Sequence, residues 1–144
     1  MKRGKSIRVG IWGYDNDIQI FQYIGELKKI LYNMSIENHN IVLVCSLDGK
    51  ANEMILIVSK LLGIGYDVWL SSKPSQYTQK FNDMEYAIFN RVLFGARGYK
   101  IVPFWMESAV ISNDLDVLIL LKDGKIHIAN ISIDKDKVEE RQNE

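Results

Sequence analysis

Residues 41–70 read Ile41-Val-Leu-Val-Cys-Ser46, Leu47-Asp-Gly-Lys50, Ala51 to Leu62, Gly63-Ile-Gly65 and Tyr66-Asp-Val-Trp-Leu70. The pattern predicts a strand, a turn, a helix and a second strand, because the first run is apolar throughout, as in a strand buried on both faces of a parallel sheet. Asp48-Gly49 favours a tight turn, and Gly63 stands where helices commonly end in a glycine. The chain then returns at once to an apolar strand. We therefore expect two parallel strands joined by a right-handed crossover.

The same alternation of strands and helices continues on both sides of this unit. The predicted elements are a strand at 6–12, an amphipathic helix at about 18–31, a helix from Asn82 or Asp83 to about Gly95, and strands at 99–104, 115–121 and 125–133. Lys122-Asp-Gly-Lys125 predicts a two-residue hairpin between the last two strands. The order predicts an α/β fold, a three-layer, doubly wound, mostly parallel Rossmann-like sheet with an antiparallel C-terminal edge hairpin. We expect one domain over residues 1–133 and a charged tail over 134–144.

Two of the predicted helices have distinctive apolar surfaces. The helix at 51–62 is apolar nearly all round and should be buried, either by its neighbours on the sheet or in a dimer interface. The helix after Asn82 should turn Met84, Ala87, Ile88 and Leu93 towards the core.

Composition excludes several classes of protein. The chain has 144 residues, of which 47% are hydrophobic and 25% charged, as in an ordinary single globular domain. Its formal net charge is zero, so nucleic acid is not an expected partner. Neither a signal peptide nor a run of about 20 apolar residues is visible, which predicts a cytoplasmic protein with no membrane contact. The single cysteine and the lack of a Cys/His cluster predict no metal site, and we expect no cofactor.

In a doubly wound sheet, ligands bind beyond the carboxyl ends of the strands, where the strand order reverses. Gly13, Tyr14 and Asp15 follow the first predicted strand. A glycine there lets a ligand approach backbone N–H groups at a helix N-terminus, which suits phosphate, although a glycine is also normal in any tight turn. The stretch Gly10-Ile-Trp-Gly13 lacks the third glycine of the dinucleotide-binding fingerprint.

The turn after the second predicted strand is the richer candidate. Gly49 and the following helix N-terminus are suited to an anion, Lys50 adds a positive charge and Ser46 a hydroxyl group. The glycine spacing of a Walker A loop is missing, which argues against a nucleoside triphosphatase. The alternative is that Asp48 only caps the helix and that Lys50 is solvated.

Other reactive side chains fit two interpretations each. Cys45 ends a buried strand without a histidine nearby in the sequence, which favours a core cysteine over a nucleophile. Carboxylates expected near the cleft could cleave a glycosidic bond, or simply cap helices: Asp15, Glu53, Glu107 and Asp114. Aromatic side chains could stack on a base, or complete the core or a subunit interface: Tyr14, Trp69, Tyr77, Phe104 and Trp105.

Three stretches together resemble the SLOG superfamily, which includes lysine-decarboxylase-like proteins and cytokinin-activating phosphoribohydrolases. They are Arg8-Val-Gly-Ile-Trp-Gly13, the segment from Val44-Cys-Ser-Leu-Asp-Gly49 to Gly65-Tyr-Asp-Val68, and Ser112-Asn-Asp-Leu-Asp-Val-Leu-Ile-Leu-Leu121. The resemblance covers roughly residues 6–124. It implies a Rossmann-like fold and a nucleotide or phosphoribosyl ligand at the carboxyl ends of the strands.

The chain departs from that family where the family's catalysis resides. The double glycine after the second strand is reduced to Asp48-Gly49, and no arginine stands at Met106-Glu107-Ser108. The second glycine-rich motif, which carries the catalytic glutamate in the family, is replaced by Lys122-Asp-Gly-Lys-Ile-His127. The resemblance therefore implies the fold and the cleft without the phosphoribohydrolase activity.

These observations predict a non-catalytic domain that binds a nucleotide- or phosphoribosyl-type small ligand and forms a homo-oligomer. The predicted ligand-binding residues are Gly13, Tyr14, Asp15, Ser46, Asp48, Gly49, Lys50 and Glu107. One alternative is a homodimeric protein-interaction scaffold. The other is an N-glycosidase-type nucleotide hydrolase that uses Glu53 or Glu107.

Overall fold

The computed structural model describes residues 6–13, 22–37, 40–47, 52–79 and 81–131. Strands and helices alternate along these segments. The elements are β1 (Ile7–Gly13), α1 (Ile24–Glu37), β2 (Ile41–Ser46), α2 (Asn52–Leu62), β3 (Tyr66–Leu70), the 3-10 helix η2 (Pro74–Thr78), α3 (Asp83–Gly95), β4 (Gly98–Ile101), the 3-10 helix η3 (Phe104–Met106), α4 (Glu107–Asp114), β5 (Val117–Lys122) and β6 (Lys125–Asn130).

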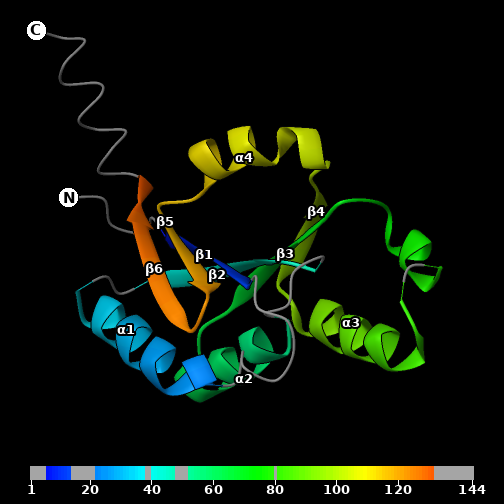
Figure 1. The fold of residues 1–144 in the computed structure, drawn as a ribbon. Helices are drawn as coiled ribbons and strands as arrows, with labels where there is room; N and C mark the ends of the chain where they lie inside the picture. Colours follow the sequence, from blue (N-terminus) through cyan, green and yellow to red (C-terminus); the bar gives the residue numbers. More distant parts are fainter. Residues whose placement is uncertain (1–5, 14–21, 38–39, 48–51, 80, 132–144) are drawn as a thin grey trace, which may run out of the picture.

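The strands form one six-stranded sheet in the order β4-β3-β2-β1-β5-β6. Every neighbouring pair is parallel except β5 and β6. Helices α1, α2 and α3 cover one face of the sheet and α4 crosses the other, so the molecule has three layers (Figure 1). The predicted fold class, a doubly wound and mostly parallel sheet with an antiparallel edge hairpin, is confirmed.

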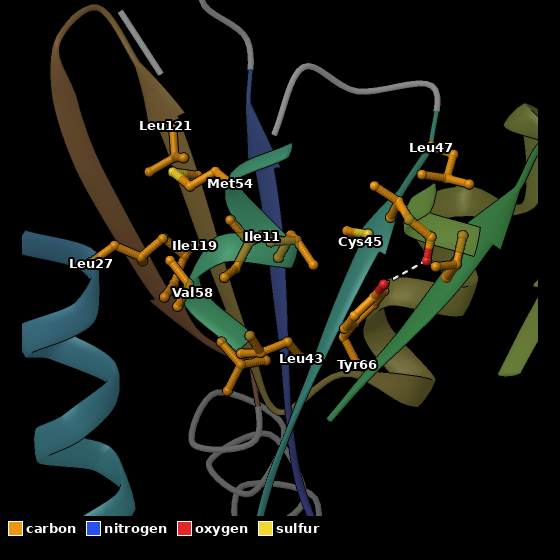
Figure 2. Packing of buried hydrophobic residues seen from close by; sticks show 14 of the residues in the cluster. Ile11, Leu27, Leu43, Cys45, Leu47, Met54, Val58, Tyr66, Ile119 and Leu121 are labelled. Carbon is orange, nitrogen blue, oxygen red and sulfur yellow. Dashed lines mark hydrogen bonds between the residues drawn. The ribbon is translucent and has the colours of Figure 1, made fainter. Parts of the chain in front are cut away.

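The larger core lies between the sheet and the layer of α1, α2 and α3. Figure 2 shows Leu27 of α1 and Val58 of α2 packed over Leu43 of β2 and Ile119 of β5. The buried side chains of α2 lie between those of α1 and α3 in this layer. Neighbouring elements thus bury Met54, Ile55 and Val58, as in the first of the two predicted arrangements, while Leu61 stays 54% exposed.

The second face of the sheet carries a smaller and more polar core. Trp12, Val44 and Trp69 lie side by side on β1, β2 and β3, and α4 packs Val110 and Ile111 against this cluster. One short helix shields less of a sheet than three do. This face therefore keeps charged side chains close to the sheet surface.

The hairpin and the start of α3 form as predicted. Asp123 and Gly124 both adopt positive φ angles, 54° and 73°, which is the geometry of a type I′ turn. Asn82 caps α3, because its side chain accepts a hydrogen bond from the backbone of Glu85 while the Glu85 side chain accepts one from the backbone of Asn82.

The predicted core face of α3 is only half right: Ile88 and Leu93 pack against the core, whereas Met84 and Ala87 are exposed. Met84 is 75% exposed, whereas Phe89 and Val92 are buried. The reason lies in η2, which precedes α3 in the chain. It brings the buried Tyr77 into the core and stacks its ring on Phe89 at 4.5 Å between centroids. This aromatic contact favours a rotation of α3 different from the one that periodicity alone suggested.

Candidate functional site

The strand order locates the expected ligand crevice between β1 and β5. The chain leaves β1 through α1 on one face of the sheet and reaches β5 through α4 on the other face (Figure 1). The strand order reverses beside β1, which is the place where a crevice is expected in doubly wound sheets, although here β5 leaves this edge through the hairpin to β6 and not through a helix. Gly13 is opposite Leu121 at this edge.

Two of the predicted ligand-binding residues end adjacent parallel strands. Gly13 is the last residue of β1 and Ser46 is the last residue of β2, where it pairs with Trp69 of β3. Parallel neighbours end at the same edge of a sheet, so both residues lie at the carboxyl edge where the crevice is expected. The other predicted residues of the two turns lie outside the described residues: Tyr14, Asp15, Asp48, Gly49 and Lys50.

Glu107 reaches the same edge from the opposite layer. It is the first residue of α4, and its Oε1 accepts a hydrogen bond of 3.0 Å from Nε1 of Trp12, the residue before Gly13. The Trp12 ring meets the Trp69 ring edge-on, with 5.5 Å between centroids. A carboxylate has acceptor capacity for more than one partner. Glu107 is thus positioned to accept a hydrogen bond from a hydroxyl or amino group of a ligand at this edge.

The predicted carboxylates do not all gather at the crevice. Asp114 lies at the far end of α4, about 10 Å of helix away from Glu107. There its Oδ2 pairs with the guanidinium group of Arg8 at 2.9 Å. Glu53 is in the first turn of α2, and Asp15 lies beyond the described part of the chain. The expectation that Asp114 belongs to the cleft is wrong.

Arg8 organises a charged cluster that sequence reasoning missed. Its two terminal nitrogens bind Asp67 of β3 and Asp114 of α4, each at 2.9 Å, and its backbone N–H donates to Asp116 at 2.9 Å. Burial alone would lower the pKa of Arg8, but the hydrogen bonds to the two carboxylates outweigh it and raise the pKa. The sequence did contain a signal for this cluster, since Arg8 stands in an otherwise apolar strand. A charge that is buried in such a strand needs charged or polar partners.

A cavity of about 240 Å³ opens beside this cluster, on the face of the sheet that α4 crosses. Its lining includes Arg8, Asp67, Trp69, Arg97 and Lys100. Lys100 Nζ lies 3.5 Å from Asp114 and 5.3 Å from the centroid of the Trp69 ring. The cavity therefore combines three cationic side chains with an aromatic wall.

The structure decides between the two interpretations of Cys45 and shows which of the described aromatic side chains are buried. Burial raises the pKa of the Cys45 thiol to about 12, so it stays protonated and is a core residue. Trp69 and Tyr77 are likewise buried in the two cores, whereas Phe104 and Trp105 are exposed.

Within the described ranges, no three His, Cys, Asp or Glu side chains are grouped so as to hold a metal ion. No helix among these residues combines the length and the apolar character that crossing a bilayer requires. Comparisons with protein-family models, with curated proteins and with solved structures found no match. Membership of the SLOG superfamily therefore stays a prediction.

Proposed function

We propose that this protein binds a phosphorylated, nucleotide-type small molecule at the crevice between β1 and β5, without chemically changing it. The observation that carries the proposal is the convergence of Gly13, Ser46 and the Trp12-bound carboxylate of Glu107 on the edge where the strand order reverses. Crevices at this place in doubly wound sheets are where nucleotides commonly bind.

Each part of the proposed crevice corresponds to a part of such a ligand. Phosphate suits the glycine turns and Lys50 that follow β1 and β2 in the sequence. Glu107 Oε1 is held by the indole of Trp12, and a carboxylate in that position suits ribose hydroxyls or a base amino group. The distance between Glu107 and Asp114 along α4 argues against these two acids acting as a hydrolytic pair.

Thermal unfolding in the presence of mononucleotides, dinucleotides and nucleotide sugars tests this proposal. A ligand at a hundred times its Kd adds about 2.7 kcal/mol to the free energy of unfolding, which should raise Tm by several degrees. Lys50→Met should reduce the rise, and Glu107→Gln should change which ligands stabilise the protein. Lys60→Met, at an exposed lysine in the last turn of α2, serves as the matched control.

Absence of stabilisation by every one of these ligands at millimolar concentration would contradict the proposal. So would equal stabilisation of the wild-type protein and the Lys50→Met variant. Turnover of any stabilising nucleotide would contradict the non-catalytic part alone.

A second candidate function, assembly into a homodimer, is favoured by the outer edge of β4. This edge strand exposes Tyr99 and Ile101, and the chain continues directly into Phe104 and Trp105, which is 83% exposed. An edge strand also presents unpaired backbone groups on its outer side. Antiparallel pairing of β4 with β4 of a second copy would satisfy those groups and bury the apolar side chains.

Light scattering coupled to size exclusion tests the dimer, which should have twice the 16.6 kDa mass of the chain. Ile101→Lys should give a monomer, because a lysine on an edge strand opposes pairing. Ile128→Lys is a matched control, because Ile128 lies on the opposite edge strand, β6, and both isoleucines are 45% exposed. A monomeric wild-type protein, or equal effects of the two substitutions, would contradict the β4 interface.

A further inference from the structure

The cavity beside Arg8 contains hydrogen-bond donors that lack acceptors. Nε of Arg8 and Nε1 of Trp69 are both buried, and neither has a hydrogen-bond partner in the described part of the chain. Both residues line the same cavity of about 240 Å³, and Trp69 is only 2% exposed. Buried polar atoms are normally paired, so two orphan donors at one cavity call for an acceptor from outside the chain.

The chemistry of the unmatched groups indicates which kind of acceptor is missing. An indole N–H and an arginine Nε–H can only donate, so the missing partner must supply oxygen or nitrogen lone pairs. Arg97 and Lys100 add positive charge at the same cavity, and Lys100 is held over the Trp69 ring.

Part of this positive charge is already compensated within the chain. Asp67 and Asp114 pair with the terminal nitrogens of Arg8, and Asp67 lies 4.0 Å from Arg97. With Asp116, which accepts from the backbone N–H of Arg8 at 2.9 Å, three carboxylates stand beside the three cations. An oxoanion would therefore be attracted by the two orphan donors and by the exposed ends of Arg97 and Lys100, not by an excess of positive charge.

We propose that this cavity is a second binding site, separate from the crevice at β1 and β5, for a small organic oxoanion. A carboxylate and a phosphate monoester share the required chemistry, because each offers several acceptor oxygens and a negative charge. The site does not depend on nucleotide binding at the crevice, because its charged lining residues, Arg8, Arg97 and Lys100, are not among the predicted crevice residues, although the Trp69 ring also meets the ring of Trp12.

The three tryptophans of the chain make this proposal directly measurable. Trp12 donates to Glu107, Trp105 is exposed, and Trp69 lines the cavity, so their indole N–H signals in a proton–nitrogen correlation spectrum report different places. Titration with sodium acetate and, separately, with methyl phosphate should shift the Trp69 signal downfield and to saturation. The tighter of the two titrations identifies the preferred oxoanion. Trp69→Phe assigns the signal; if that variant does not fold, Trp12→Phe and Trp105→Phe assign it by elimination.

Substitution of a cavity lysine supplies the second measurement. Lys100→Met should raise the apparent Kd of the preferred oxoanion about three- to tenfold, since one charged partner is lost. Lys60→Met, on the distant helix α2, should leave it unchanged.

Three results would overturn the proposal. The first is a Trp69 signal that moves with neither acetate nor methyl phosphate, which would mean that water alone meets these donors. The second is a shift that sodium chloride reproduces at the same ionic strength. The third is an equal Kd for the wild-type protein and Lys100→Met.

Discussion

At the scale of single residues, burial determines the chemical state of the side chains on the larger core. Cys45 is fully buried, and desolvation raises the pKa of its thiol from 9.0 to about 12. Tyr66 is buried beside it and donates to the backbone carbonyl of Val92 at 2.6 Å. Figure 2 draws a dashed line from the Tyr66 hydroxyl group. Burial, and then the nearby Cys45, raise the pKa of Tyr66 to about 12.

These two groups predict a loss of stability at alkaline pH. The neutral forms are favoured in the folded protein, so the stability they contribute is fully present below the unfolded pKa of 9.0 for the cysteine and is lost as pH rises towards about 12. Each group can lower the free energy of unfolding by up to about 1.4 kcal/mol per pH unit in its window. Urea unfolding from pH 8 to 11 measures this slope. Cys45→Ala should have a shallower slope, and identical slopes would contradict the assignment to Cys45.

Gly10 shows how packing on the second face requires a glycine. A Cβ atom at this position would lie 2.5 Å from the Trp12 ring and 2.6 Å from a methyl group of Leu115. Gly10→Ala should therefore lower the free energy of unfolding by about 1–3 kcal/mol through overpacking.

Gly98 is the matched control for that substitution, because a Cβ there meets no atom within 4 Å. Gly98→Ala should have little effect on the unfolding midpoint in urea. An equal loss of unfolding free energy in the two variants would contradict this prediction. It would mean that the backbone freedom of glycine, and not crowding by Trp12 and Leu115, determines the effect at both positions.

At the scale of elements, local hydrogen bonds define where α3 begins even though periodicity failed to define which face it buries. The capping box of Asn82 and Glu85 uses neighbours in the sequence and was predictable. The buried face depends on Tyr77 in η2, which a reading of the helix alone does not include.

Removal of the cap has a predictable cost. Asn82→Ala should destabilise the protein by about 1 kcal/mol, because the backbone N–H of Glu85 loses its acceptor. Asn90→Ala, at an exposed position within the same helix, should be neutral or slightly stabilising because alanine has the higher helix propensity. Thermal unfolding of the two variants decides the matter: equal midpoints would show that the cap contributes nothing.

At the scale of the whole molecule, Arg8 connects three elements that are distant in the sequence. Its side chain joins β1 to Asp67, 59 residues away, and to Asp114, 106 residues away. The Trp12–Glu107 hydrogen bond holds the other end of α4. Among the described residues, α4 is the α-helix on the second face, and polar contacts attach both of its ends to the sheet.

Loss of the Arg8 contacts should weaken the molecule as a whole. Arg8→Met leaves two half-buried carboxylates without their main partner, which should cost about 1–3 kcal/mol, less than a fully buried pair would. Arg91→Met, at an exposed arginine of α3, should change little. In the double variant Arg8→Met/Asp67→Asn the cost should be less than the sum of the single losses. Strict additivity in urea unfolding would show that the two side chains do not stabilise each other.

The sequence by itself determined the features that depend on neighbouring residues. Apolar runs such as Ile41–Cys45 specify buried strands, Asp123-Gly124 specifies the hairpin and Asn82 specifies a helix start, because each acts through the backbone within a few residues. It also placed Gly13 and Ser46 at strand ends, since strand boundaries are local.

Only the tertiary structure decided what lies together across the sheet. The order of the strands, the pairing of Trp12 with Glu107 and the exclusion of Asp114 from the crevice all depend on the path of α4 over the second face. The cavity beside Arg8 likewise combines residues from β1, β3 and β4. Such contacts form between chain segments separated by tens of residues, and no local pattern of charge or hydrophobicity encodes which partner each segment meets.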